Sequence, residues 1–394
     1  MSLYREIVCR RQYACAVLLS LLFIGMSMPA HSQMGKVTEC TLGSTTIRTG
    51  AMMLFSRGHN LVGTNVAVVC NHTSLVDGVH LVDTLLRCGV RVVKLFCPEH
   101  GFRGTAAAGA RVDDGMDSQT GLPVISLYGR NKKPTAAQLA DVDCVVFDLQ
   151  DVGCRFYTYL STLHYVMQAC AECGKPIVVL DRPNPNGHYV DGPVLDTARC
   201  RSFVGMHPVP VVYGMTIGEY ALMVNGEGWL GSDHWGDTLR CPLTVVPLEG
   251  YSHDSLCCRQ VTLPVPPSPN LRTPQAIALY PSLCLLEGTT VSLGRGTPFP
   301  FEVIGNQPDT MDLRQVDVAS RFELKYLAAF LRRTPQGNFF LANNFFEKLA
   351  GTTELRHQLT SGMDESAIRA TWQPALQHFK EVRQRYLLYP DGVR

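Results

Sequence analysis

The fold is indicated most clearly by the stretch Val145-Val146-Phe147-Asp148-Leu149-Gln150-Asp151-Val152-Gly153. In this stretch an apolar, β-branched run is followed directly by the carboxylate of Asp148. Three other segments repeat this arrangement of an apolar run and then a polar cluster: 66–74 (VAVVC, NHTS), 92–101 (VVKLF, CPEHG) and 177–187 (IVVL, DRPNPNG). In a parallel α/β sheet the carboxyl ends of the strands lie at one edge, where ligands bind. We therefore expect the four clusters to converge and to form a catalytic site.

Helical patterns alternate with these apolar runs. Apolar residues recur every three or four positions in 75–88 and in 157–173, which ends at Gly174, and Pro134 opens a short helix at 135–140. Strands that alternate with helices at this spacing predict an α/β fold, with a doubly wound parallel sheet covered on both faces.

The character of the sequence changes near Pro208. We expect a helix at 216–230, a proline-dense loop at 263–270, and further helices at 322–333, 343–350, 353–360 and 364–386. The 394 residues are enough for two domains. We therefore expect a catalytic α/β domain at 33–205 and a smaller α+β domain at 206–394.

The N-terminus has the pattern of a secretory signal. Arg5, Arg10 and Arg11 precede an apolar run at 14–26, and small residues follow at Ala30 and Ser32. This run is shorter than the ~18–20 residues that a membrane-spanning helix needs, so no stable membrane span is expected. The sequence predicts a signal peptide at 1–32, cleavage near residues 32–33, and a periplasmic or secreted protein.

Charge and cysteine content narrow the function further. The net charge of +1 and the lack of a basic run with interleaved aromatic residues argue against nucleic acid as a partner. The 15 cysteines are scattered without the paired spacing of a zinc site, so most are expected to be buried hydrophobic residues. No nucleotide-binding, serine-hydrolase or zinc-protease motif occurs, and no cofactor is expected.

Glu99 is the first candidate catalytic residue. It follows Pro98, which fixes the backbone, and it precedes His100 and Gly101 at an expected strand end. A carboxylic acid in a walled pocket can hold its proton at neutral pH and act as a general acid. The alternative is that Glu99 caps the next helix, but the three neighbouring polar clusters favour catalysis.

Asp148 and Asp151 are the other catalytic candidates. Two carboxylates at a strand end can act as acid and base, or can hold a metal together with Asp181 and His100. No spacing among these residues is diagnostic of a metal site, so we expect none. Arg155 follows closely and would keep an aspartate ionised, and the alternative is a salt-bridged loop.

The remaining candidates would bind substrate. Residues 181–187 form a turn held rigid by two prolines, which suits a hydroxyl-rich ligand, although a plain loop is the alternative. Arg295 lies between two glycines, where its guanidinium could bind a carboxylate. Tyr157 could stack on a sugar ring, or it could pack in a helix. The candidate substrate-binding residues are Asn71, His100, Arg103, Arg155, Tyr157, Asp181, Arg182, Asn184, His207, Glu287 and Arg295.

Long motifs connect the chain to a known family. The stretches CPEHGFRGTAAAG, GLPVISLYG, FDLQDVGCRFYTY, VVLDRPNPNG, FVGMHPVPVVYGMTIGE, PPSPNLRTP and LLEGTTVSLGRGTPFPFEVIG resemble the NamZ-type exo-β-N-acetylmuramidases from about residue 45 to the C-terminus. The resemblance implies a glycoside hydrolase that releases N-acetylmuramic acid from the non-reducing end of peptidoglycan fragments. It also implies a Rossmann-like N-terminal domain with a smaller C-terminal domain closing over the cleft.

The resemblance also implies residue roles. The family glutamate falls on Glu99, which would protonate the glycosidic oxygen. Asp148 or Asp151 would act as the base, as the nucleophile, or as the group that stabilises the positively charged oxocarbenium-like sugar. An arginine (Arg155, Arg182 or Arg295) would read the lactyl carboxylate that distinguishes muramic acid from glucosamine.

Two departures from the family pattern keep alternatives open. Cys97 stands where the family usually has Ser, and only a short segment links Gly305 to Met311. The rival functions are a non-catalytic periplasmic muropeptide-binding protein and a metal-dependent hydrolase of another substrate.

Overall fold

A computed structural model describes residues 46–99, 102, 114–335 and 337–392. His100 and Arg103, the segment 1–32 and the expected cleavage position lie outside the described residues.

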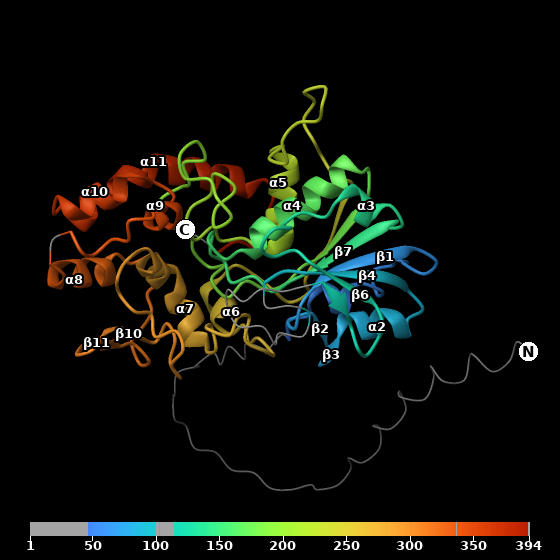
Figure 1. Ribbon diagram of the computed structural model, residues 1–394, viewed down its shortest axis with the longest axis horizontal. Helices are drawn as coiled ribbons and strands as arrows, with labels where there is room; N and C mark the ends of the chain where they lie inside the picture. Colours follow the sequence, from blue (N-terminus) through green and yellow to red (C-terminus); the bar gives the residue numbers. More distant parts are fainter. Residues whose placement is uncertain (1–45, 100–101, 103–113, 336, 393–394) are drawn as a thin grey trace, which may run out of the picture. The chain divides into compact units, whose positions relative to one another are not determined.

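A seven-stranded sheet forms the centre of the described fold (Figure 1). Its spatial order is β5-β6-β4-β1-β7-β8-β9, and all neighbours are parallel except β5 and β6. The strands are β1 (Asn65–Cys70), β4 (Arg91–Cys97), β5 (Gly115–Met116), β6 (Pro123–Ser126), β7 (Cys144–Asp148), β8 (Ile177–Leu180) and β9 (Leu243–Val246). The predicted α/β fold with a mainly parallel sheet is confirmed.

The order of the parallel strands locates a ligand-binding crevice. Numbered among themselves along the chain, the six parallel strands stand in the order 3-2-1-4-5-6, which is the Rossmann order. Successive strands add to one side of β1 up to β6, and then to the other side from β7 to β9. The direction of winding therefore reverses between β1 and β7, and ligands of such sheets bind beyond the strand ends at that point.

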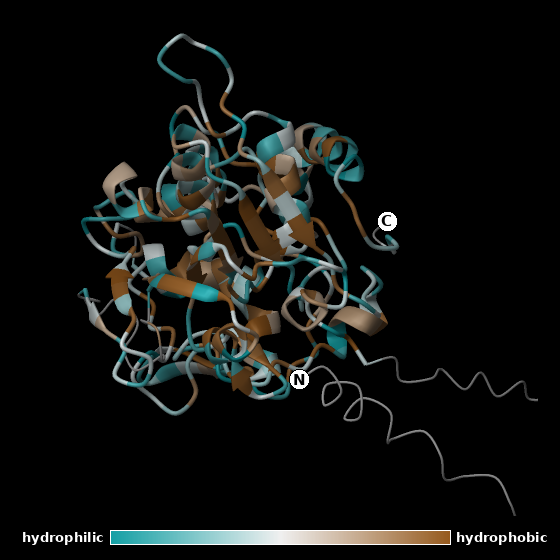
Figure 2. Cartoon of the chain, turned by 90° about the vertical axis from the view of Figure 1, so that its right-hand side faces the viewer, coloured by the Kyte–Doolittle hydropathy of each residue, from teal (hydrophilic) through white to brown (hydrophobic). Residues whose placement is uncertain are grey.

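Both faces of the sheet are buried. Along β1, Ala67 and Val69 belong to one hydrophobic cluster, while Val66, Val68 and Cys70 belong to another. Helices α3 (Ala136–Leu139), α4 (Tyr159–Glu172) and α5 (Ile217–Gly226) cover the first face, and α1 (Gly50–Met53) and α2 (Leu81–Arg87) cover the second (Figure 1). The strands appear in Figure 2 as hydrophobic segments between more polar helices. Such double burial explains the continuous apolar runs in the sequence.

The C-terminal part shares the core of the first face. One continuous hydrophobic cluster extends from Ala67 of the sheet to Trp372 and Val382 of the last helix. The elements of this part are α6 (Ser255–Arg259), α7 (Pro274–Leu283), η1 (Cys284–Gly288), β10 (Val303–Asn306), β11 (Asp309–Asp312), α8 (Lys325–Arg333), α9 (Phe345–Ala350), α10 (Glu354–Thr360) and α11 (Glu365–Gln384). The domain boundary at residue 206 stays a prediction, and β9, from beyond it, extends the main sheet.

One expected helix is shorter than predicted. Residues 75–80 form a hairpin of β2 (Leu75–Val76) and β3 (Val79–His80), and the helix begins only at Leu81. Asp77 and Gly78 have φ of 49° and 79°, which is the left-handed backbone of a tight Asp-Gly hairpin turn. The turn chemistry therefore overrides the helical spacing of the apolar residues.

The described cysteines form no disulfide, and most of them are buried. No helix among the described residues is both long and apolar enough to cross a membrane.

Candidate active site

The loops after β1 and β7 meet at the point where the winding reverses. Cys70 and Asp148 are register partners at the ends of these strands. The Ser74 hydroxyl donates to the Asp148 carbonyl at 2.6 Å, and the Gln150 N–H donates to the Thr73 hydroxyl at 3.2 Å. The polar clusters at 71–74 and 148–153 therefore converge as the sequence predicts.

Asp148 is paired with Arg182 across the ends of β7 and β8. The Arg182 Nε and Nη2 atoms donate to the two carboxylate oxygens at 2.5 and 2.7 Å. The Asp148 side chain is fully buried and that of Arg182 is 3% exposed. Both oxygens of Asp148 are thus held by one guanidinium in a bidentate pair, which favours a fixed geometry.

Asp151 is buried in a different environment. One carboxylate oxygen accepts hydrogen bonds from the Gly153 N–H, at 2.6 Å, and from the Tyr213 hydroxyl. The other oxygen, Oδ1, is buried and has no hydrogen-bond partner. Burial raises the pKa of Asp151 from 3.8 to about 6, against the opposing effect of these hydrogen bonds. A buried carboxyl with an unsatisfied oxygen and a raised pKa is typical of a functional site.

The charge of Glu99 acts on three tyrosines. This residue is half-buried and lies just beyond β4, in a turn. Burial, the charge of Glu99 and a hydrogen bond to it raise the pKa of Tyr128. Burial raises the pKa of Tyr157 and of Tyr159, and the charges of Glu99 and Asp151 both add to the effect. Tyr157 and Tyr159 are therefore close to both carboxyl groups, and link the predicted acid to the cluster after β7.

Hydrogen bonds from Asn71 and Tyr157 connect the loop after β1, the start of α4 and the proline-dense segment. The Asn71 amide donates to the Tyr159 hydroxyl at 2.7 Å, while its oxygen accepts from Thr73. The Tyr157 hydroxyl donates to the Pro267 carbonyl at 2.7 Å. His72 is hydrogen-bonded to the Pro266 carbonyl at 2.9 Å. The proline-dense segment thus lies directly against the strand-end cluster.

Asp181 anchors the surrounding structure. Its carboxylate accepts from the hydroxyls of Tyr389 and Thr216, at 2.5 and 2.7 Å, and from the Gly218 N–H at the start of α5. Burial, and then the charge of Glu219, raise the pKa of Asp181 to about 6. With these donors around it, Asp181 fixes α5 and the C-terminal segment, and its predicted role in substrate binding stays a prediction.

Asn184 fixes the turn after β8. Its amide donates to the Met215 carbonyl at 2.8 Å, and its oxygen accepts from the Asn186 N–H. Gly153 has φ of +80°, and a Cβ there would meet the Asn184 oxygen at 2.3 Å. The close approach of these two loops therefore requires glycine.

Arg155 and His207 are buried, and their side chains bind groups other than Asp148 and Asp151. The Arg155 Nη atoms donate to the carbonyls of Pro193, Val209 and Leu349 at 2.7 to 2.8 Å, and burial lowers the pKa of Arg155 to about 10. The expected pairing of Arg155 with a neighbouring aspartate is wrong for the described contacts, because Arg182 makes that pair instead. His207 is hydrogen-bonded to His164 and to the Tyr220 hydroxyl.

Glu287 and Arg295 pair with each other. The distance between Arg295 Nη2 and a Glu287 oxygen is 2.5 Å, and the Arg295 side chain is 43% exposed. Among the candidate arginines with described side chains, Arg295 is the one open to solvent, since Arg155 and Arg182 are buried.

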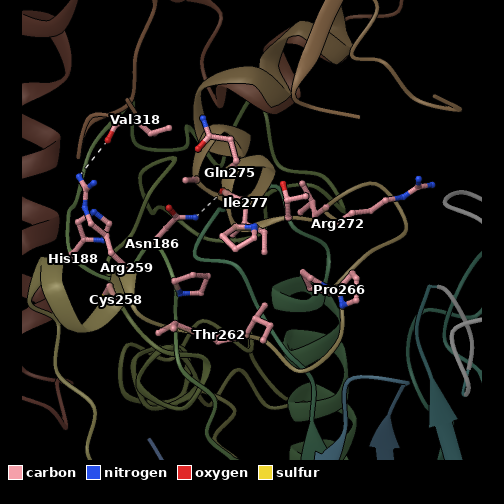
Figure 3. Close-up of a pocket in the computed structure, with 18 of the residues that line it drawn as sticks. Asn186, His188, Cys258, Arg259, Thr262, Pro266, Arg272, Gln275, Ile277 and Val318 are labelled. Atoms are coloured by element: carbon pink, nitrogen blue, oxygen red, sulfur yellow. Dashed lines mark hydrogen bonds between the residues drawn. The ribbon is translucent and has the colours of Figure 1, made fainter. Parts of the chain in front are cut away.

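A cavity of about 400 Å³ lies beside the proline-dense segment (Figure 3). Its walls include Pro266 and Pro267, whose carbonyls contact His72 and Tyr157. Asn186 and Arg259 also line it, whereas Arg272 points outward in the view of Figure 3. The cavity therefore adjoins the strand-end cluster through a wall that they share.

Metal ligands are not assembled in the described part of the chain. No group of three or more His, Cys, Asp or Glu side chains there has an arrangement that could hold a metal ion. His100, one of the ligands considered, lies outside the described residues.

Comparison with known proteins identifies the family. The N-terminal domain model of exo-β-N-acetylmuramidase NamZ matches residues 66–275, and the C-terminal domain model matches 278–319 and 312–389. This chain belongs to the NamZ family. The resemblance predicted from the motifs is confirmed, and the matched range contains the strand-end cluster of Asp148 and Asp151 together with Glu99.

One curated relative and two solved structures each cover more than four fifths of this chain. The peptidoglycan β-N-acetylmuramidase NamZ of Bacillus subtilis (strain 168) is 35% identical over 376 residues, which cover 84% of this chain and 88% of that protein. A crystal structure of a DUF1343 family protein from Bacteroides fragilis has a TM-score of 0.77 and 39% identity, covering 88% of this chain and 100% of its own. A second such structure has a TM-score of 0.72 and 28% identity, covering 87% and 99%.

Two tyrosines near the carboxyl groups of this NamZ family member were not among the predicted site residues. Tyr128 contacts Glu99 and Tyr213 contacts Asp151. The available signal for Tyr128 was its place in the GLPVISLYG motif, directly after the run Pro123–Ser126 that forms β6, the third parallel strand along the chain. Tyr213 comes from a loop that carries no strand-end signal.

Proposed function

We propose that this chain is an exo-acting glycoside hydrolase that releases N-acetylmuramic acid from the non-reducing end of peptidoglycan fragments such as MurNAc–GlcNAc. The observation that carries the proposal is the position of Glu99, just beyond β4 at the ligand-binding edge of a Rossmann-type sheet, where its charge acts on three tyrosines. The matched relative in Bacillus subtilis is named a peptidoglycan β-N-acetylmuramidase, which supplies the substrate class.

Glu99 acts as the general acid. Its O–H bond breaks, the proton passes to the glycosidic oxygen, and the electron pair of the bond from C1 to that oxygen leaves with the departing GlcNAc. The positive charge that develops at C1 and the ring oxygen is then quenched by water, which loses a proton. Glycosidases use a second carboxyl group for this half of the reaction.

Asp151 is the better candidate for that second group. Both oxygens of Asp148 are held by Arg182, whereas Asp151 has a buried oxygen with no hydrogen-bond partner. The raised pKa of Asp151, about 6, places its titration close to neutral pH, as acid–base work requires. Asp148 then acts as a fixed support for the loop after β7.

Arg295 binds the lactyl carboxylate of muramic acid and so recognises this sugar. Its guanidinium is partly exposed and its present partner, Glu287, is a carboxylate, so a substrate carboxylate can replace or share that contact. Arg155 and Arg182 are buried and are already bound to carbonyls and to Asp148.

We further propose that the chain is exported and processed near residue 33. The support is the basic, apolar and small-residue order of the first 32 residues. Peptidoglycan lies outside the cytoplasmic membrane, so export places the enzyme with its substrate.

The test is sugar release by the purified chain. MurNAc–GlcNAc and GlcNAc–GlcNAc are incubated with the protein, and the free monosaccharides are measured by mass spectrometry. We expect free N-acetylmuramic acid from the first disaccharide and at least a hundredfold slower cleavage of the second, which lacks the lactyl carboxylate. Binding of MurNAc–GlcNAc without release would replace the hydrolase with a muropeptide-binding protein, and equal cleavage of both would refute the role of the lactyl group.

A further inference from the structure

Glu99 and Tyr128 occupy equivalent positions on neighbouring strands. β4 and β6 are parallel partners, with Cys97 opposite Ser126 at their ends. The Leu127 N–H donates to the Cys97 carbonyl at 2.8 Å, which extends the pairing by one residue. Glu99 and Tyr128 each follow their registered residue by two positions, and the phenol is hydrogen-bonded to the carboxylate.

The backbone of Tyr128 is fixed by its neighbours. The Tyr128 N–H donates to the Ser126 hydroxyl at 3.2 Å, and the Ser126 N–H donates to an Asp114 oxygen at 2.8 Å. The turn after β6 therefore holds the backbone of Tyr128 in a defined place.

Among the described residues, the charge of Glu99 acts on the titratable groups Tyr128, Tyr157 and Tyr159, and the charge of Asp151 acts on the last two. The Tyr157 hydroxyl already donates to Pro267, and the Tyr159 hydroxyl accepts from Asn71. Tyr128 is half-buried at the edge of the cluster. Burial and the negative charge of Glu99 raise the pKa of Tyr128, so its phenol keeps its proton and remains a donor at neutral pH.

We propose that Tyr128 is a positioning residue for Glu99, whose phenol O–H holds the carboxyl group in place and stabilises the negative charge that forms there when the proton leaves. This inference rests on the proposed function of Glu99 as general acid. A hydrogen bond to a charged oxygen is about twice as strong as one to a neutral oxygen. The contact therefore strengthens as the reaction proceeds, and such a contact accelerates the chemical step more than it improves substrate binding.

The test is Tyr128→Phe, which removes the hydroxyl and keeps the ring. We expect kcat on MurNAc–GlcNAc to fall by about tenfold or more with KM nearly unchanged, as for an interaction that strengthens in the transition state. Because ionised Glu99 loses a donor, the basic limb of the kcat profile should move to higher pH. Tyr165→Phe is the matched control, a half-buried tyrosine whose ring stacks on Phe203, and it should leave both readouts unchanged.

A second measurement does not depend on turnover. The carboxyl carbons of ¹³C-labelled glutamate are titrated by NMR, and Glu99→Gln assigns the Glu99 signal. The titration midpoint of that signal should be higher in Tyr128→Phe than in the parent chain. The same midpoint in both proteins overturns the role of Tyr128, even if the parent chain releases N-acetylmuramic acid. A shifted midpoint in a chain without activity upholds the contact and refutes the proposed function instead.

Discussion

Asp151→Asn should stabilise the fold at neutral pH and leave it little changed in acid. The folded-state pKa of Asp151 is about 6, raised by burial from 3.8. Between these values the folded protein holds a proton that the unfolded chain has lost, so the free energy of unfolding falls as pH rises. The favourable contribution is complete below about pH 4 and is lost above about pH 6.

The magnitude follows from the two pKa values. Each pKa unit corresponds to about 1.4 kcal/mol, so the charge of Asp151 costs on the order of 3 kcal/mol above pH 6. Asparagine has no charge to bury, and it keeps an oxygen to accept from Gly153 and Tyr213. Its amide N–H₂ takes the place of the Oδ1 atom that has no partner in the parent chain. Asp181, whose pKa is also raised, is present in both proteins, so its effect cancels in the comparison.

Urea unfolding at a series of pH values between 4 and 8 measures the effect. The difference in unfolding free energy between Asp151→Asn and the parent chain should move by about 3 kcal/mol in favour of the variant across this range. The same variant should lose activity if Asp151 is the second carboxyl group. Asp309→Asn, at an exposed position, is the control and should change stability by less than about 0.5 kcal/mol. A difference for Asp151→Asn that does not vary with pH refutes the reasoning.

Two further predictions concern the buried ion pair and export. Arg182→Met leaves the fully buried Asp148 carboxylate without its partner, so unfolding in urea at pH 7 should show a loss of about 3–5 kcal/mol; a loss below 1 kcal/mol would contradict the pairing. In a Gram-negative host, the mass of the chain recovered from the periplasm should correspond to residues 33–394, and a full-length chain confined to the cytoplasm would refute export.

The parallel sheet could be predicted because its strands are buried on both faces. Doubly buried strands are continuous apolar runs, and four of these runs are β1, β4, β7 and β8. β9 could not be found in this way, because Leu243–Val246 is a short edge strand that is mostly half-buried or exposed. The hairpin at 75–80 was missed because its apolar residues also fit a helix, whereas the Asp77-Gly78 turn decides the local structure.

It was easier to predict which residues lie at the site than to predict which of their side chains bind each other. Strand-end position brings Asn71, Asp148 and Asp181 to one edge, and this follows from the alternation of strands and helices. The partner of a buried charge is chosen by distance in space, so Asp148 pairs with Arg182, 34 residues away, and not with nearby Arg155. The pairing of Tyr128 with Glu99 depends on the register of β4 and β6, which the sequence alone does not show.

The most direct test of the account compares Glu99→Gln with the parent chain in the release of N-acetylmuramic acid from MurNAc–GlcNAc. Glutamine keeps the size of the side chain and cannot give a proton, so release should fall by about 10²–10⁴-fold. Glu249→Gln, which alters an exposed ion pair with Arg48, should leave the rate unchanged. A Glu99→Gln protein that is folded and still releases the sugar at the parent rate would contradict the assignment of the general acid.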